Sequence, residues 1–412
     1  MYKRIVDDRW SFKDANTKEY THCYHTYPAM MIPQIARTLI EEYKPEGRLK
    51  LILDPYMGSG TTLVEASLLG INSIGTDLNP LARLMGKVKT THYNCASIVK
   101  QFRSLQSELV FYTENKVKER NFDRISNYSF WYNEETLLKL SYLSQLINDM
   151  EDKDFFNVIL SEVVREVSFT RNGEFKRYRM SENSIAKFNP NTFALFEKKA
   201  LRNIDGLERY NKKAKGNATT NIYSFNSVYG FPKDVLKEGD VDMVVTSPPY
   251  GDSRTTVAYG QFSRWANEWF NFENAKNLDR LLMGGERAAK EIFGTISIRD
   301  VLDEIDKLEH KRYLEVVSFL NDYYRSIKNV AKVVRKGGTV CYVVGDRRVK
   351  GVQIPLDLFT AEMFENFGFK HKITLIREIP NKRMPAKTSP TNKAGMKVST
   401  MSHEYIVILD KL

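Results

Sequence analysis

The feature that most constrains the fold is a pair of adjacent prolines directly after an apolar run. Residues 241–246 read Val-Asp-Met-Val-Val-Thr, and Ser-Pro-Pro-Tyr follows at 247–250. The apolar run predicts a buried strand. Each proline fixes its own φ and has no N–H to donate, so the strand must end there. The Ser247 hydroxyl and the Pro248 carbonyl then point outward as acceptors, and the aromatic ring of Tyr250 follows them. The sequence therefore predicts a polar strand tip suited to binding a planar amine.

A second candidate site lies at 51–62, where the chain has the pattern of a strand, a glycine turn and the start of a helix. Gly58 and Gly60 let the backbone pass close to a ligand, and the amides at the start of the helix can bind its polar groups. The next predicted strand, at 73–76, is followed by Asp77. A carboxylate there can accept both hydroxyls of a ribose, although Asp77 could instead cap a helix.

Together the two segments resemble the amino-group DNA methyltransferases that use S-adenosyl-L-methionine. Residues 54–60 are similar to the cofactor motif of that family, with Tyr56 where Phe is usual, and 247–250 are similar to its catalytic motif. Within the family, Ser-Pro-Pro-Tyr is most typical of cytosine-N4 methylation, whereas adenine-N6 enzymes more often begin this motif with Asp or Asn. The resemblance implies S-adenosyl-L-methionine as cofactor and duplex DNA as partner, with the target cytosine flipped out of the helix. Adenine-N6 methylation is the nearest alternative.

Other segments extend the resemblance along the chain. They are 25–29 as an N-terminal cofactor motif, 330–338 with 339–346 as a late helix, turn and strand, and Met384-Pro385 with 404–409 as a closing hairpin. His25 could equally be a packing residue. The resemblance implies an α/β fold, a Rossmann-like class I methyltransferase sheet with a mainly helical insertion.

The resemblance also implies a role for individual residues. The catalytic residues would be Ser247, Pro248, Pro249 and Tyr250. The cofactor contacts would be Tyr27, Pro28, Ala29, Asp54, Pro55, Tyr56, Met57, Gly58, Gly60, Thr61, Asp77, Leu78, Asn79 and Asn226. At Asn226 the family usually has an acidic residue.

The expected chemistry explains these residue types. The exocyclic nitrogen of cytosine is a poor nucleophile because its lone pair is delocalised into the ring. Hydrogen bonds from the amine to the Ser247 hydroxyl and the Pro248 carbonyl would localise that lone pair toward the methyl group. Tyr250 would form the stacking wall for the flipped base. This chemistry requires neither a metal nor a cysteine nucleophile.

Composition agrees with this interpretation. The 412 residues contain 62 Lys and Arg against 51 Asp and Glu, a formal net charge of +11. A basic surplus favours a polyanionic partner, although it is also compatible with ordinary solubility. Three scattered cysteines, Cys23, Cys95 and Cys341, suggest neither a disulfide framework nor a zinc site. We find no signal-peptide pattern and no apolar run of membrane-spanning length, so we expect a cytoplasmic protein without membrane association.

The α/β pattern breaks in the middle of the chain. We expect a catalytic domain whose N-terminal part is 1–93 and whose C-terminal part is 219–412. Between them, 94–218 is predicted to be a mainly helical insertion and a candidate target-recognition region. The non-sheet segment 263–312 competes for that role.

Two stretches are candidates for DNA contact. The basic aromatic stretch 171–179 predicts phosphate contacts by Lys176, Arg177 and Arg179. Alternatively, the same stretch is a charged edge exposed to solvent with no role in binding. Arg254 lies in a polar loop after the catalytic motif, which could close over the base or be a plain surface loop.

Three function classes remain open. The first is a site-specific DNA methyltransferase, the modification enzyme of a restriction-modification system with a separate restriction endonuclease. The second is an RNA guanine-N2 methyltransferase, although those enzymes usually have Asp before the prolines and an N-terminal RNA-binding domain. The third is a non-catalytic nucleic-acid binding module, and the intact motifs argue against it.

Overall fold

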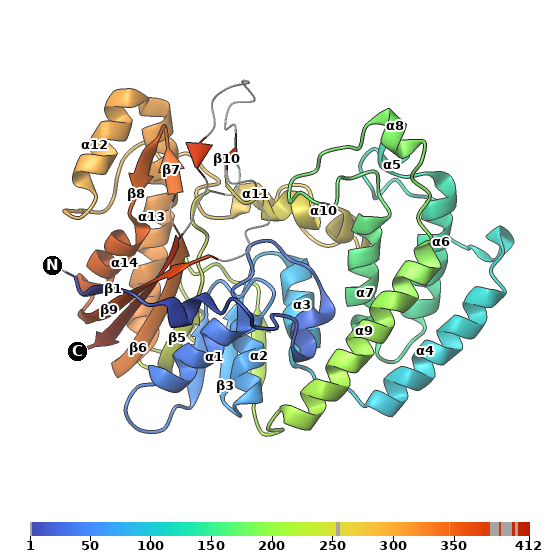
Figure 1. The fold of residues 1–412 in the computed structure, drawn as a ribbon, viewed down its shortest axis with the longest axis horizontal. Coiled ribbons are helices and arrows are strands. Elements are labelled where there is room, and N and C mark those ends of the chain that lie inside the picture. The colour runs from blue at the N-terminus through green and yellow to red at the C-terminus, as the bar shows by residue number, and fades with distance from the viewer. Residues whose placement is uncertain (1, 253–255, 346, 380–386, 389–397, 400–402) are drawn as a thin grey trace.

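A single eight-stranded sheet forms the centre of the computed structural model, which describes residues 2–252, 256–345, 347–379, 387–388, 398–399 and 403–412 (Figure 1). In sheet order the strands are β1 (Arg4–Val6), β9 (Phe369–Glu378), β12 (His403–Lys411), β6 (Val334–Gly345), β5 (Val241–Thr246), β2 (Leu51–Asp54), β3 (Asn72–Thr76) and β4 (Thr220–Tyr223). All neighbours are parallel except β12, which is antiparallel to both β6 and β9. Two small antiparallel pairs complete the described strands: β7 (Arg347–Val349) with β8 (Val352–Ile354), and β10 (Lys387–Thr388) with β11 (Val398–Ser399).

The strand order identifies where a ligand can bind. Counted along the chain from β2, the parallel strands lie in the order third, second, first, fourth and fifth, which is the order of a Rossmann-like sheet. The predicted α/β Rossmann-like sheet is therefore confirmed. The order reverses between β2 and β5, and ligands of such sheets bind outside the carboxyl ends of the strands at that point.

Helices cover both faces of the sheet. The α-helices are α1 (Pro33–Glu42), α2 (Thr61–Leu68), α3 (Pro80–Thr90), α4 (Cys95–Val110), α5 (Tyr128–Trp131), α6 (Glu134–Asn148), α7 (Lys153–Glu166), α8 (Glu182–Ile185), α9 (Thr192–Lys213), α10 (Tyr259–Trp269), α11 (Leu278–Leu281), α12 (Arg299–Leu308), α13 (His310–Val333) and α14 (Leu356–Glu365). The 3-10 helices are η1 (Asp8–Ser11), η2 (Tyr20–Tyr24) and η3 (Glu114–Lys116).

Alternation along the central strands explains the two layers. Ile52, Met243 and Val245 pack with α1 and α2 on one face, whereas Leu53 and Val244 pack with α13 and α14 on the other. Successive side chains of a strand point to opposite faces, so these apolar runs are buried on both sides. This burial fixes the register that brings the strand ends together.

Helices α4 to α9, residues 95–213, form a separate helical body at one end of the molecule (Figure 1). Its apolar core also includes Leu81, Met85 and Val88 of α3 and the rings of Trp265 and Trp269 on α10. Helix α10, which follows the catalytic motif, therefore packs against the helical body. By contrast, Leu302 and Ile305 of α12 belong to the core on the sheet side. The segment 263–312 is thus divided between the two bodies.

Element boundaries depart from the expected ones in places. Strand β6 begins at Val334 and passes through Gly337, although the glycines at 337–338 suggested a turn there. Residues 384 and 385, expected in a closing hairpin, lie outside the described residues. No helix in the described part of the chain has the length and apolar character needed to cross a membrane.

Candidate active site

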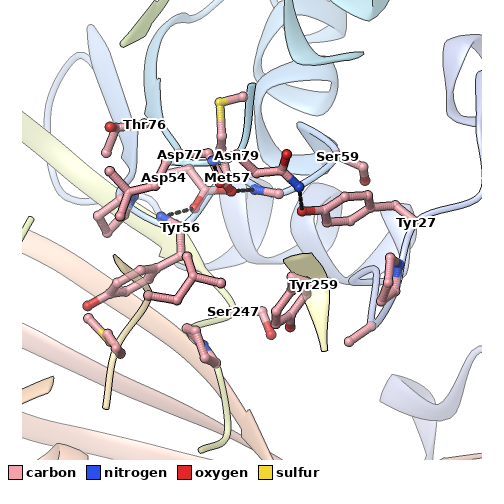
Figure 2. Close-up of a pocket in the computed structure, with 18 of the residues that line it drawn as sticks. Tyr27, Asp54, Tyr56, Met57, Ser59, Thr76, Asp77, Asn79, Ser247 and Tyr259 are labelled. Carbon is pink, nitrogen blue, oxygen red and sulfur yellow. Dashed lines mark hydrogen bonds between the residues drawn. The ribbon is translucent and has the colours of Figure 1, made fainter. Parts of the chain in front are cut away.

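A cavity opens at the carboxyl ends of β2, β3 and β5, where the strand order reverses (Figure 2). It encloses about 1000 Å³ of empty space, including its open mouth, which is ample for a nucleoside-sized ligand. The predicted residues that line it are Tyr27, Pro28, Ala29, Asp54, Pro55, Tyr56, Met57, Gly58, Thr61, Asp77, Leu78, Asn79, Asn226, Ser247 and Pro249. The structure thus brings most of the predicted cofactor and catalytic residues around one space.

The glycine turn after β2 is built around Asp54. The Asp54 carboxylate accepts hydrogen bonds from the Tyr56 amide at 3.2 Å and from the Thr246 hydroxyl of β5 at 2.6 Å. Gly60 has φ of +80°, and a Cβ there would lie 3.0 Å from the Cα of Gly86 on α3. A side chain at Gly60 would therefore strain the turn, which explains the glycine although it does not line the cavity.

Asp77 shapes the second wall. Its carboxylate accepts hydrogen bonds from the Gly58 amide at 3.0 Å and the Asn79 amide at 2.8 Å. The helix-cap alternative for Asp77 is wrong, because the side chain of Asn79 caps α3 by accepting from the Leu81 amide. Burial raises the pKa of Asp77 to about 6, and burial has the same effect on Asp54.

Asn79 also connects the cavity to α10. Its amide nitrogen donates to the Tyr27 hydroxyl at 2.9 Å (Figure 2). The same nitrogen donates to the Ser263 hydroxyl at 2.7 Å, and the amide oxygen accepts from Asn267 at 3.1 Å. The rings of Tyr27 and Tyr259 are 5.9 Å apart. The first turns of α10 are thus joined to the cavity wall through buried polar contacts.

Several lining residues were not predicted from the sequence. They are Met30, Met31, Ser59, Thr76, Phe225, Ser227, Gly251, Tyr259, Leu282 and Met283. Thr76 and Ser227 are direct neighbours of predicted positions and could have been included on that ground. Tyr259, Leu282 and Met283 come from the segment around α10 and α11, and no local pattern marks them.

The tyrosine that replaces the usual phenylalanine has its own partners. The Tyr56 hydroxyl lies 2.5 Å from the Ser326 hydroxyl of α13, and Ser326 donates to the Ser227 hydroxyl at 2.7 Å. Ser227 is next to Asn226, whose side chain accepts from the Val228 amide at 3.0 Å. This chain of hydroxyl groups joins the glycine turn to the loop after β4 and satisfies the buried phenol.

The catalytic motif begins directly after β5. Ser247 and Pro249 line the cavity, whereas Pro248 is buried and does not line it. The hydroxyl of Tyr250 lies 3.1 Å from that of Ser247. The Tyr250 hydroxyl donates to Glu404 of β12 at 3.1 Å. Tyr250 is half-buried against the apolar core under α13, and it does not line the cavity.

His25 does not line the cavity either. It is buried beside Phe262, and its Nδ1 lies 2.5 Å from the Thr26 carbonyl. Burial lowers the pKa of His25 to about 4, so the ring is neutral at physiological pH. Its surroundings are those of a packing residue.

Arg177 lies in a narrow loop on the helical body. Thr170 and Arg179 form an isolated antiparallel bridge that closes the loop. The guanidinium carbon of Arg177 lies 4.7 Å from the ring centroid of Trp265, and burial lowers its pKa. This arginine is therefore stacked on the α10 interface, and DNA contact by it stays a prediction.

The other described candidates for DNA contact, Lys176 and Arg179, are both half-buried. Arg179 lies 4.2 Å over the ring of Phe130 and pairs with Glu182. Arg254 lies outside the described residues. Their roles at DNA likewise stay predictions.

The cavity suits S-adenosyl-L-methionine. Two buried carboxylates with raised pKa values would be stabilised in their charged forms by a ligand that brings cations and hydroxyl groups. Aromatic and methionine side chains around them suit an adenine ring and a sulfonium. Among the described residues, no group of three His, Cys, Asp or Glu side chains is placed to hold a metal.

Comparison with known proteins agrees with this site. A family model described as DNA methylase (N6_N4_Mtase) matches residues 2–84 and 241–411. Type II methyltransferase M.MvaI of Kocuria varians is 38% identical over 99% of this chain and 95% of its own length. Type II methyltransferase M.BsoBI of Geobacillus stearothermophilus is 23% identical over 90% of this chain and 84% of its own length. The chain belongs to the DNA methylase family of amino-group methyltransferases.

Similar solved structures include a putative DNA modification methylase from Thermus thermophilus in complex with S-adenosyl-L-methionine. It is 20% identical over 45% of this chain and 51% of that chain, with a TM-score of 0.21. Family membership makes S-adenosyl-L-methionine the cofactor and DNA the substrate, as predicted.

Proposed function

We propose that the protein transfers a methyl group to the exocyclic N4 amine of a cytosine flipped out of duplex DNA. The observation that carries this proposal is that Ser247 and Pro249 line the same cavity as Asp54 and Asp77. The methyl donor and the acceptor amine can therefore meet at the tip of β5. Serine as the first residue of the motif favours cytosine, and adenine-N6 methylation is the alternative, since the matched family model covers both amines.

Each wall of the cavity has a proposed task. Asp77 accepts the ribose hydroxyls, with Leu78, Asn79 and Asn226 beside the adenine. Asp54, Gly58 and the turn between them hold the methionine end of the cofactor. Residues 27–29 close the cavity on that side. Bound S-adenosyl-L-methionine supplies an electrophilic methyl group on a sulfonium sulfur.

The catalytic tip acts on the amine. The Ser247 hydroxyl and the Pro248 carbonyl accept hydrogen bonds from the two N–H groups, which localises the nitrogen lone pair. The attacking atom is the amine nitrogen of the base, so the protein supplies no nucleophile. Catalysis rests mainly on the positioning of the amine against the methyl group. The sequence predicted Tyr250 as the stacking wall for the flipped base, but its ring does not line the cavity, so we assign it the hydrogen bond to Ser247 instead.

We further propose that the helical insertion 94–218 recognises the target sequence, within a catalytic domain formed by 1–93 and 219–412. Two observations support this. The family model leaves residues 85–240 unmatched, and the core of the helical body includes α10, which is joined to the cavity by Asn79. Lys176 and Arg179 are the proposed phosphate contacts and Arg254 is proposed to meet phosphate or base. The stacking of Arg177 on Trp265 favours a structural role for that residue.

Both named relatives are Type II methyltransferases. This supports a role as the modification enzyme of a restriction-modification system, beside a separate restriction endonuclease.

The test is incubation of the purified protein with labelled S-adenosyl-L-methionine and unmethylated genomic DNA, followed by nucleoside digestion and mass spectrometry. N4-methylcytosine that disappears in Ser247→Ala supports the proposal. N6-methyladenine would keep the mechanism and overturn the base, whereas label entering only RNA would overturn the DNA substrate.

A further inference from the structure

A chain of polar groups leads from the catalytic serine, which follows β5, to residues of β12 and β9 in the same sheet. The Ser247 Oγ lies 3.1 Å from the Tyr250 hydroxyl, which donates to Glu404 Oε1 at 3.1 Å. Glu404 Oε2 lies 3.3 Å from Arg377 Nη1. Glu404 on β12 and Arg377 on β9 are direct cross-strand partners in the sheet register. Three strands therefore hold the chain in place beneath the catalytic motif.

Stability alone does not account for this pair. Arg377 has 1% of its side chain exposed and Glu404 has 18%. Removing two charges from water costs about as much as their attraction returns, so an apolar pair would serve the sheet equally well. The pair instead places a carboxylate next to the tyrosine of the catalytic motif.

The carboxylate determines the direction of every hydrogen bond in the chain. An ionised Glu404 can only accept, so the Tyr250 hydroxyl must donate to it. The Tyr250 oxygen is then free to accept from the Ser247 hydroxyl. With its proton directed to Tyr250, Ser247 presents lone pairs to the cavity, as an acceptor for an amine requires.

We infer that Glu404 is a positioning residue for methyl transfer, which both orients the Ser247 hydroxyl through Tyr250 and takes up the proton that the amine releases. The inference rests on the proposed function. The target nitrogen gains a bond to the methyl carbon, whose bond to sulfur breaks with its electron pair, and the nitrogen then loses one proton. That proton passes to Ser247 Oγ, the serine proton to the Tyr250 oxygen, and the phenolic proton to Glu404.

The acceptor has the surroundings that such a role needs. Burial raises the pKa of Glu404, which makes it a better base, while Arg377 stabilises its charged form. Because part of the Glu404 side chain is exposed, the proton can leave to water after each turnover.

The test compares Glu404→Gln with Tyr250→Phe in single-turnover methylation of DNA. Glutamine can still accept from Tyr250 but takes up no proton, and phenylalanine breaks the chain while keeping the ring. We expect either variant to lower the rate roughly a hundredfold, the usual size of a general-base contribution. The double variant should be no slower than the slower single variant, because both act in one chain. The KM for DNA and the calorimetric affinity for S-adenosylhomocysteine should change by less than about twofold.

A matched control is Glu378→Gln, which changes the exposed carboxylate next to Arg377 on β9. Its side chain points to the opposite face of the strand from Arg377, so its rate should equal that of wild type. A solvent deuterium isotope effect on the wild-type rate should fall toward one in Tyr250→Phe, which a purely structural role would not produce.

The outcomes separate the two proposals. Absence of a methylated amine from the wild-type reaction would overturn both the function and the relay. Normal wild-type methylation with unchanged rates in Glu404→Gln and Tyr250→Phe would overturn the relay alone. So would a defect confined to the KM for DNA or to the affinity for S-adenosylhomocysteine.

Discussion

Arg347 and Asp252 form a buried ion pair, with 2.7 Å between the guanidinium Nη2 and the carboxylate Oδ2. Asp252 is the second residue after the catalytic motif, and Arg347 begins β7. The pair leaves no room for a side chain at Gly251, where a Cβ would lie 2.5 Å from Arg347 Nη1. The segment that leaves the catalytic motif is therefore anchored to β7, the strand that follows β6 along the chain.

The first prediction concerns this anchor. Arg347→Met removes the cation beside a buried carboxylate, which should lower the free energy of unfolding by about 3 kcal/mol. The methylation rate should fall as well, because the catalytic motif loses its support. Thermal unfolding and single-turnover assays measure the two effects. Arg348→Met is the control, since Arg348 is exposed and its guanidinium makes a 3.4 Å contact with Gln353. Equal melting temperatures for the two variants would contradict the anchor.

The second prediction concerns the hydroxyl groups behind the glycine turn. Tyr56→Phe should cost less than about 1 kcal/mol of stability, because Ser326 keeps its hydrogen bond to Ser227. Ser326→Ala should cost more, about 2 kcal/mol, since it leaves the buried Tyr56 phenol without its Ser326 partner. Chemical denaturation of both variants tests this order. A larger loss in Tyr56→Phe would show that the phenol makes a contact more important than the one to Ser326.

The third prediction is a pH dependence of cofactor binding. Burial raises the pKa of Asp54 and of Asp77 from 3.8 to about 6. Their charged forms bind the cofactor, so affinity should be full above about pH 7 and fall as the pH drops through 6, by up to roughly tenfold per unit for each carboxylate. Calorimetric titration with S-adenosylhomocysteine between pH 5 and 8 measures this. In Asp77→Asn the affinity for S-adenosylhomocysteine should depend less steeply on pH, because one of the two titrating carboxylates is gone.

The stability of the ligand-free protein separates this effect from unfolding. A carboxyl whose pKa is higher in the folded state than in the unfolded state binds more protons when folded. Asp54 and Asp77 therefore add stability as the pH falls from 7 toward 4, while their affinity for the cofactor declines. A melting temperature that falls in parallel with affinity in this range would assign the loss to other groups.

Local patterns predicted those parts of the site that lie at strand ends. Asp54, Asp77 and Ser247 each follow a predicted strand, and the carboxyl ends of neighbouring parallel strands meet at one edge, so these residues had to be close together. The same reasoning placed the glycine turn and its helix. The spacing of apolar residues, in turn, predicted mainly helices for the middle of the chain.

Contacts between distant segments could not be predicted in this way. Tyr259 reaches the cavity because α10 packs on the helical body through Trp265 and Trp269, an arrangement that no local sequence spacing predicts. Met283 reaches it from the apolar core on the sheet side. Arg377 gave no signal, because a charged residue among apolar neighbours in a strand normally indicates an exposed position. It is buried because β12 presents a carboxylate directly opposite it.

The last prediction tests which basic residues of the helical body contact DNA. Lys176→Ala should weaken DNA binding and reduce the slope of log affinity against log salt by about one, as expected when one phosphate contact is lost. Its melting temperature should stay near that of wild type. Arg177→Ala should instead lower the melting temperature, because the Arg177 guanidinium is stacked on Trp265 at the α10 interface. Fluorescence anisotropy over a salt series, with thermal unfolding of each variant, distinguishes the two. An unchanged salt slope in Lys176→Ala would remove that residue from the DNA interface, and a changed slope without loss of stability in Arg177→Ala would place Arg177 there instead.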